Sequence, residues 1–260
     1  MASDEGAGDA GPAAAARELC RRLAPIGERE QRCRALGRLL GDRDPAEIAA
    51  VLAAVIEAAD RRHPGADLLV EAMVSPGLRT AWDERLAGRV MAHAREAGRY
   101  DLAGMFLELP ALDPRLREPS PRLPKALEKV PLGVRRAMAR RQDIDLLDRL
   151  LADPDEAVVA NLLGNPRITE HEVVRMAARS PVREEVLVAI ARHPRWGASG
   201  RIRLTLALNP ATPTPITLAL LHLLLEQDLR AVVAETRLSS AVTGRATALL
   251  RDRSRSGGRG

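Results

Sequence analysis

Apolar residues recur along most of the chain at the spacing of amphipathic helices, without the strict alternation that a half-buried strand requires. The clearest segment is residues 44–62, "DPAEIAAVLAAVIEAADRR", where Asp44 can cap a helix and Pro45 fits its first turn. Its apolar positions fall on one stripe: Ile48, Val51, Leu52 and Val55. The same reasoning predicts about six helices within a helical N-terminal region, residues 13–109.

The places where helical periodicity is interrupted indicate the domain boundaries. Residues 77–98, "GLRTAWDERLAGRVMAHAREAG", predict a second long amphipathic helix closed by Gly98. Residues 110–131 then contain six prolines, which forbid a long helix and indicate a linker. Residues 1–12 and the basic residues 252–260 lack apolar periodicity, so both ends are predicted to be disordered tails.

Residues 132–251 contain a recurring nine-residue pattern. It reads "VVANLLGNP" from Val158, "VLVAIARHP" from Val186 and "IRLTLALNP" from Ile202, and it returns without the proline at Val134 and Leu229. Its first and fifth positions are aliphatic or Met, as expected for a stripe buried between stacked units. The step from Val186 to Ile202 is the shortest, and it is interpreted as an irregular unit in which "PRWGASG" replaces the second helix.

The stretch "LLGNPRITEHEVVRMAARSP", residues 162–181, contains signals for two helix ends and one helix start. Gly164 and Asn165 are suited to a left-handed helix end, and Pro166 prevents continuation. Thr169 with Glu172 forms a capping-box signature for the next helix. Ser180-Pro181 then predicts another start.

Short helices separated by "NP" turns make residues 132–251 resemble the variant leucine-rich repeats and related HEAT-like α-solenoids. The resemblance implies an all-α fold, an irregular right-handed α-solenoid of short helical repeats preceded by the α-helical N-terminal region. It implies binding in general and no particular ligand. Some variant leucine-rich repeat proteins carry an iron–sulfur cluster on several cysteines; this chain has only Cys20 and Cys33, so that cofactor is not carried over.

The charge of the chain admits two interpretations. Its net charge is +5, and all 40 basic residues except Lys125 and Lys129 are arginine. An arginine-rich surface suits phosphate backbones, whereas GC-rich coding would give the same bias without any phosphate site. The second position of the nine-residue pattern gives three candidate partner-binding residues: Arg135, Arg203 and Arg230. The chain's four aromatic residues leave little for stacking of single-stranded bases.

Motifs of known chemistry are incomplete in this sequence. "GAGDAG" at residues 6–11 matches a dinucleotide-binding spacing but follows no strand, and "HEVVRM" has Arg175 where a zinc protease needs its second His. Glu172 is better explained as a capping residue and His171 as solvated. "GASG" at residues 197–200 is interpreted as a turn. No catalytic, cofactor-binding or metal-binding residue is therefore predicted.

These observations favour a non-enzymatic protein–protein interaction scaffold that has a protein partner and no cofactor. The alternative is backbone-level nucleic-acid binding through an arginine-rich solenoid face, with or without enzymatic action on the nucleic acid. The longest apolar run, residues 216–225, is half the length of a membrane span, so no membrane association is expected. The N-terminus lacks a signal-peptide pattern and cysteines are few, which predicts a cytoplasmic location. The oligomeric state is left open.

Overall fold

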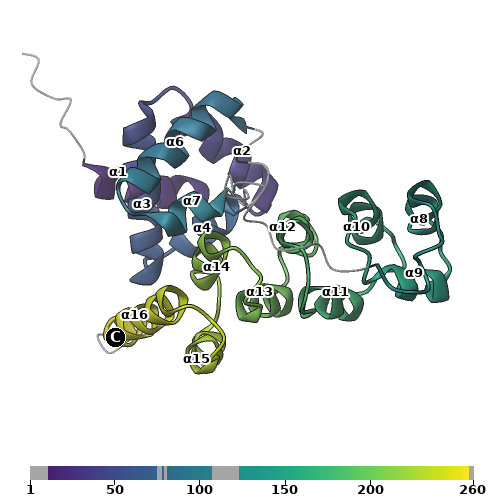
Figure 1. Ribbon diagram of the computed structural model, residues 1–260. Coiled ribbons are helices and arrows are strands. Elements are labelled where there is room, and N and C mark those ends of the chain that lie inside the picture. The colour runs from purple at the N-terminus through teal and green to yellow at the C-terminus, as the bar shows by residue number, and fades with distance from the viewer. Residues whose placement is uncertain (1–10, 75–77, 79–80, 107–122, 258–260) are drawn as a thin grey trace, which may run out of the picture. The chain divides into compact units, whose positions relative to one another are not determined.

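The computed structural model describes residues 11–74, 78, 81–106 and 123–257, with side chains up to residue 255. Throughout these residues the fold is all-α, without a strand, as the periodicity predicted (Figure 1). The chain divides into two compact units. The first comprises residues up to Phe106 together with those from Arg251 onward, and the second comprises Leu107–Leu250.

The first unit is built around one apolar helix. Its helices in the described residues are α1 (Pro12–Leu23), α2 (Arg29–Leu40), α3 (Pro45–Asp60), α4 (Ala66–Met73), α6 (Glu84–Glu96) and α7 (Tyr100–Met105). Helix α3 packs against α1, α4, α6 and α7. Its predicted stripe is buried, since each of its four residues is at most 1% exposed. At its start the Asp44 carboxylate accepts the Ala46 amide at 2.8 Å, which confirms the predicted cap.

Helix α6 is shorter than the sequence predicted. Asp83 is its N-cap, because the Asp83 carboxylate accepts the Leu86 amide at 2.6 Å and fixes the helix start there rather than near residue 77. The predicted end is confirmed. Gly98 follows the helix with φ +69°, a left-handed conformation that glycine adopts without the steric cost of a Cβ.

The second unit consists of short helices that pack in two rows. They are α8 (Leu132–Met138), α9 (Ile144–Leu150), α10 (Glu156–Leu163), α11 (Glu170–Ala177), α12 (Glu184–Arg192), α13 (Gly200–Leu208), α14 (Thr214–Leu221) and α15 (Glu226–Ala234). The longer helix α16 (Ser240–Gly257) follows, and its residues from Arg251 onward belong to the first unit. Helices α8, α10 and α12 pack in succession along one row, and α11, α13 and α15 along the other (Figure 1). From α10 to α13, each helix thus buries apolar residues against the helix beside it in its row.

The nine-residue pattern changes rows within the unit. The copies that start at Val134, Val158 and Val186 lie on α8, α10 and α12, whereas those at Ile202 and Leu229 lie on α13 and α15 of the other row. The segment "PRWGASG" is the loop that joins the rows. The short step between two copies is therefore the step from α12 in one row to α13 in the other, and not an irregular unit that lacks its second helix.

The helix boundaries in "LLGNPRITEHEVVRMAARSP" differ in part from the prediction. Gly164 has φ −83°, a right-handed conformation, so the left-handed helix end is wrong. The capping box is confirmed, because the Thr169 amide donates to Glu172 Oε2 at 2.7 Å. Helix α12 begins at Glu184, three residues beyond Pro181.

The structure describes only part of the predicted linker and of the predicted tails. Of the proline-rich stretch, residues 110–122 lie outside the described part, and residues 123–130 form turns that bury Leu127. Residues 1–10 and 258–260 of the predicted tails also lie outside it. Helix α16 continues to Gly257, beyond the predicted start of the C-terminal tail at residue 252, since its arginines are compatible with helix.

Candidate binding cavity

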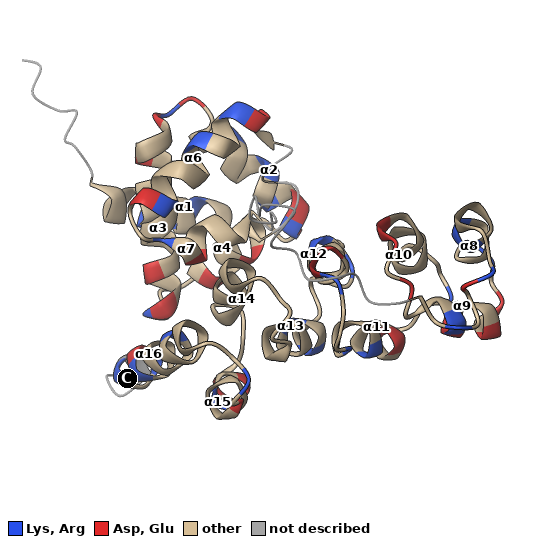
Figure 2. Cartoon of the chain, viewed as in Figure 1, with Lys and Arg blue, Asp and Glu red and all other residues tan. Residues whose placement is uncertain are grey.

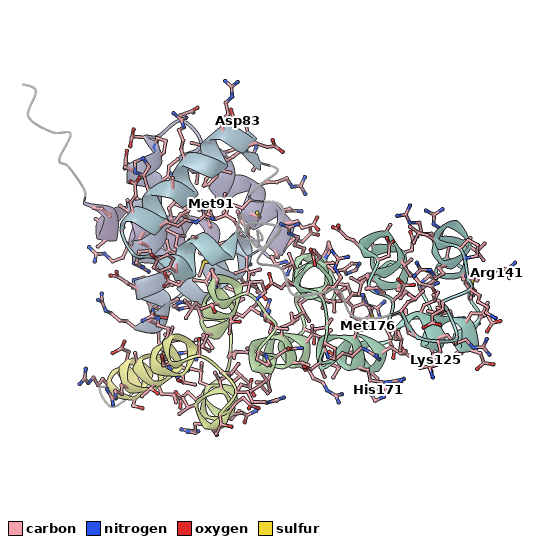
Figure 3. All side chains as sticks on the ribbon, viewed as in Figure 1. Asp83, Met91, Lys125, Arg141, His171 and Met176 are labelled. Carbon is pink, nitrogen blue, oxygen red and sulfur yellow. The ribbon has the colours of Figure 1, made fainter. Side chains whose placement is uncertain are left out.

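A cavity of about 290 Å³ opens in the second unit between two loops that occupy equivalent places in successive repeats. One loop joins α9 to α10 and the other joins α11 to α12. Its apolar wall is formed by the residues Leu151, Pro154, Met176, Pro181, Val182 and Val186. Its polar and charged lining residues are Asp153, Arg179, Ser180 and Arg183. Met176 and the exposed His171 project from opposite sides of α11, so only the former reaches the cavity (Figure 3).

Asp153 is one of the residues that line the cavity, and its side chain is fully buried. The Arg135 guanidinium donates to its Oδ2, and the Asp155 amide donates to its Oδ1 at 2.9 Å. Arg135 is itself only 12% exposed. A buried carboxylate is tolerated only when it is paired in this way, so this ion pair has a structural role that ties α8 to the next loop.

Arg183 is also neutralised within the structure. Its Nε donates to Glu185 Oε2 at 3.1 Å and its second guanidinium nitrogen donates to Oε1 at 3.0 Å. This two-point geometry holds both side chains beside the cavity. Arg183, which lines the cavity, and Arg135, which binds the lining residue Asp153, therefore each have a carboxylate partner.

Arg179 differs from both. Its side chain is exposed and its guanidinium makes no hydrogen bond or ion pair with any of the residues that the structure describes. Its backbone is nevertheless fixed, because its carbonyl accepts the Asn209 side-chain amide at 2.9 Å. The cavity thus has one uncompensated positive charge on an anchored loop.

The asparagines of the "NP" turns link consecutive repeats. Asn165 Nδ2 donates to the Ala139 carbonyl at 2.9 Å and to the Arg141 carbonyl at 2.8 Å, across the turn that follows α8. Asn209 Nδ2 binds the turn after α11 in the same way, with the Ala177 carbonyl at 2.7 Å. Each asparagine also accepts the amide of the residue two positions later, and both are buried. They satisfy backbone carbonyls that the helix ends leave without partners.

His193 occupies the same position as these asparagines but does not make their bonds. The nearby Trp196 Nε1 instead donates to the Leu163 carbonyl at 2.8 Å, which is the equivalent acceptor at the end of α10. Burial and then the positive charge of Arg195 lower the pKa of His193 below its ordinary value. His193 is therefore a turn residue, and the indole supplies the link.

The three arginines predicted to bind a partner do not share one environment. Arg135 is bound to buried Asp153, and Arg203 is 7% exposed with its Nε donating to the Gly197 carbonyl at 2.8 Å. Arg230 is exposed and lies 3.5 Å from Glu226 on its own helix. Because the pattern changes rows, Arg135 lies on one row and the other two lie on the second. The structure does not bring them together.

Basic and acidic residues are interspersed over the second unit (Figure 2). Arg136 pairs with Asp155 at 3.3 Å, and Arg175 pairs with Asp148 at 2.7 Å. Burial raises the pKa of Asp155, but the hydrogen bonds from Arg136 and the Val158 amide outweigh it, so the pKa lies below its ordinary value. Local pairing of this kind reduces the positive field that would attract a phosphate backbone.

Other sequence motifs provide no site in the described residues. No group of three or more His, Cys, Asp or Glu side chains there is arranged to hold a metal ion. Within the described part, no helix has both the length and the apolar character needed to cross a membrane. The "GASG" segment is a turn, and Ser199 caps α13 with its hydroxyl 3.3 Å from the Ile202 amide. Of "GAGDAG", only Gly11 is described.

Comparison of the chain with protein families, with curated proteins and with solved structures found no match.

Proposed function

We propose that this chain is a protein-binding module, a HEAT-like right-handed α-solenoid in its second unit, that takes up a segment of a partner protein in the cavity between the α9–α10 and α11–α12 loops. The observation that carries the proposal is that cavity, which has an apolar wall and a single guanidinium, that of Arg179, without a carboxylate partner among the described residues. Protein-binding sites combine apolar pockets with a few placed polar groups in the same manner.

The arrangement of the arginines gives less support to nucleic-acid binding. A phosphate track requires several cations that project freely from one face. Arg135 and Arg203 are instead engaged in buried or nearly buried bonds within the fold. Their replacement would report on stability rather than on binding, so the nucleic-acid alternative is better tested on the unmodified protein.

The test is selection from a displayed library of random peptides at physiological ionic strength, followed by binding measurements on the selected peptides. We expect enrichment of a common sequence motif whose binding is lost in Val182→Glu, which places a charge in the apolar wall. Val182 is half-buried in a loop, so the fold is expected to survive, as circular dichroism would verify. The matched control is Val174→Glu, a half-buried valine of α11 that does not line the cavity.

Duplex DNA and RNA provide the contrasting measurement. We expect weak binding that disappears as salt rises to about 150 mM, where the Debye length is about 8 Å. Absence of any enriched peptide together with salt-resistant duplex binding would reverse the proposal in favour of a nucleic-acid binder.

A further inference from the structure

We infer that the cavity recognises a peptide segment in which an aliphatic side chain lies next to a carboxylate, with Arg179 as the carboxylate's partner. This inference rests on the proposed function and specifies the chemistry of its ligand. It follows from the charge, the size and the lining of the cavity, taken in turn below.

The charge points to an anionic ligand with one negative group. Arg135 is neutralised by Asp153 and Arg183 by Glu185, whereas Arg179 has no partner among the described residues. One guanidinium in excess complements a single carboxylate. A phosphate-rich ligand would require several free cations.

The size of the cavity limits what can enter. About 290 Å³ lies at or below the lower end of the range of about 300–1,000 Å³ that is usual for small-molecule sites. One or two side chains of a peptide fit this volume. The wall formed by Met176, Val182 and Val186 is apolar, so an aliphatic side chain gains by leaving water there.

Arg179 is suited to anchor such a ligand because its loop is held from the next repeat. The Asn209 amide donates to both the Ala177 and the Arg179 carbonyls, at 2.7 and 2.9 Å. The backbone that carries the guanidinium is therefore ordered before any ligand arrives, which reduces the entropy lost on binding. Ser180 adds a hydroxyl to the same edge of the cavity.

A carboxylate beside an aliphatic side chain has two sources, the free C-terminus of a chain that ends in Leu and an internal Leu followed by Asp. Four acetylated peptides in a Gly-Ser context separate them: a C-terminal Leu as free acid, the same peptide as amide, an internal Leu-Asp and an internal Leu-Asn, both amidated. Binding is followed through the methyl NMR signals of the full chain. Met176, Val182 and Val186 report directly on the cavity.

We expect saturable shifts of these three methyl signals with at least one acidic peptide, and three- to tenfold weaker affinity for its neutral counterpart, a tenfold change being about 1.4 kcal/mol. In Arg179→Gln the acidic peptide should bind as weakly as the neutral one. The control is Arg175→Gln, one turn earlier on α11, whose guanidinium pairs with Asp148; it should leave the preference for the acid unchanged.

The inference would be overturned by equal binding of the acidic and neutral peptides, or by an unchanged preference for the acid in Arg179→Gln. It would also be overturned by shifts confined to other methyl groups, or by no shifts at millimolar peptide. The proposed function is tested separately from the ligand class. If library selection enriches a motif without a carboxylate and its binding still depends on Val182, the module binds protein but the ligand class is wrong; if nothing is enriched, the function itself fails.

Discussion

Replacing Asn165 with Ala tests how consecutive repeats are joined. The change removes two hydrogen bonds from Nδ2, to the Ala139 and Arg141 carbonyls, and one hydrogen bond from the Arg167 amide to Oδ1. Asn165 is 4% exposed, so water cannot readily replace the lost partners. The side chain of alanine fills less of the same space.

The magnitude follows from these three bonds. A hydrogen bond within a protein contributes about 0.5–1.5 kcal/mol net, and a buried acceptor left without a donor costs about 1–3 kcal/mol. Three bonds together therefore predict that Asn165→Ala lowers the free energy of unfolding by about 1.5–4.5 kcal/mol. The control Asn161→Ala removes two exposed bonds, one from Asn161 Nδ2 to the Arg136 carbonyl at 3.2 Å and one from Arg140 Nε to Asn161 Oδ1 at 3.2 Å, and should cost less.

The variant Asn165→Asp separates the link between repeats from the turn. Aspartate is as good a turn residue as asparagine and can still accept the Arg167 amide. It cannot donate, and at neutral pH it directs a negative oxygen at two carbonyl oxygens. Urea denaturation followed by circular dichroism should show Asn165→Asp to be at least as destabilised as Asn165→Ala. An aspartate variant as stable as the parent protein would refute the reasoning, because the turn alone would then explain the residue.

Three further predictions use the same denaturation measurement. Arg135→Ala should cost about 3–5 kcal/mol because it leaves its buried carboxylate partner unpaired, whereas exposed Arg230→Ala should change stability by less than about 1 kcal/mol; similar costs for the two would mean that the buried pair is misassigned. Leu162→Ala, at a position that is 0% exposed, should cost about 2–5 kcal/mol, against about 0.5 kcal/mol or less for exposed His171→Ala, and the reverse order would contradict the packing of α10. The lowered pKa of Asp155 means that its stabilisation is complete above the ordinary value of 3.8 and is lost as pH falls through the lower folded-state pKa; the stability advantage of the parent protein over Asp155→Asn should therefore shrink with acidification below that value, and a constant difference would contradict this ionisation.

Local chemistry was the most predictable part of the fold. The caps at Asp44 and Thr169 and the left-handed Gly98 depend on residues within three or four positions of one another, so the sequence contains what decides them. Gly164 was mispredicted for a physical reason. The helix end there is set by Asn165, whose side chain binds a turn more than twenty residues earlier, and no local pattern reveals that partner.

The change of the nine-residue pattern from one row of helices to the other could not be predicted from the sequence, and neither could the cavity. A periodic stripe shows that a helix has a buried face but not the row to which the helix belongs, so α12 and α13 looked like equivalent units. The distinction between Arg135 and Arg179 likewise depends on Asp153, a partner eighteen residues from the former. Arg179 gave no signal of its own, because only the pairing of Arg183, the other arginine that lines the cavity, marks it as the cavity's unpaired charge among the described residues.

Amide hydrogen exchange of the full chain, with and without a library-selected peptide at saturation, tests the central claim most directly. Bound peptide should slow exchange in the α9–α10 loop, residues 151–155, and in the α11–α12 loop, residues 178–183, and this protection should be lost in Val182→Glu and kept in Val174→Glu. Protection confined to other parts of the chain, or protection that survives Val182→Glu, would contradict a protein-binding module that works through this cavity.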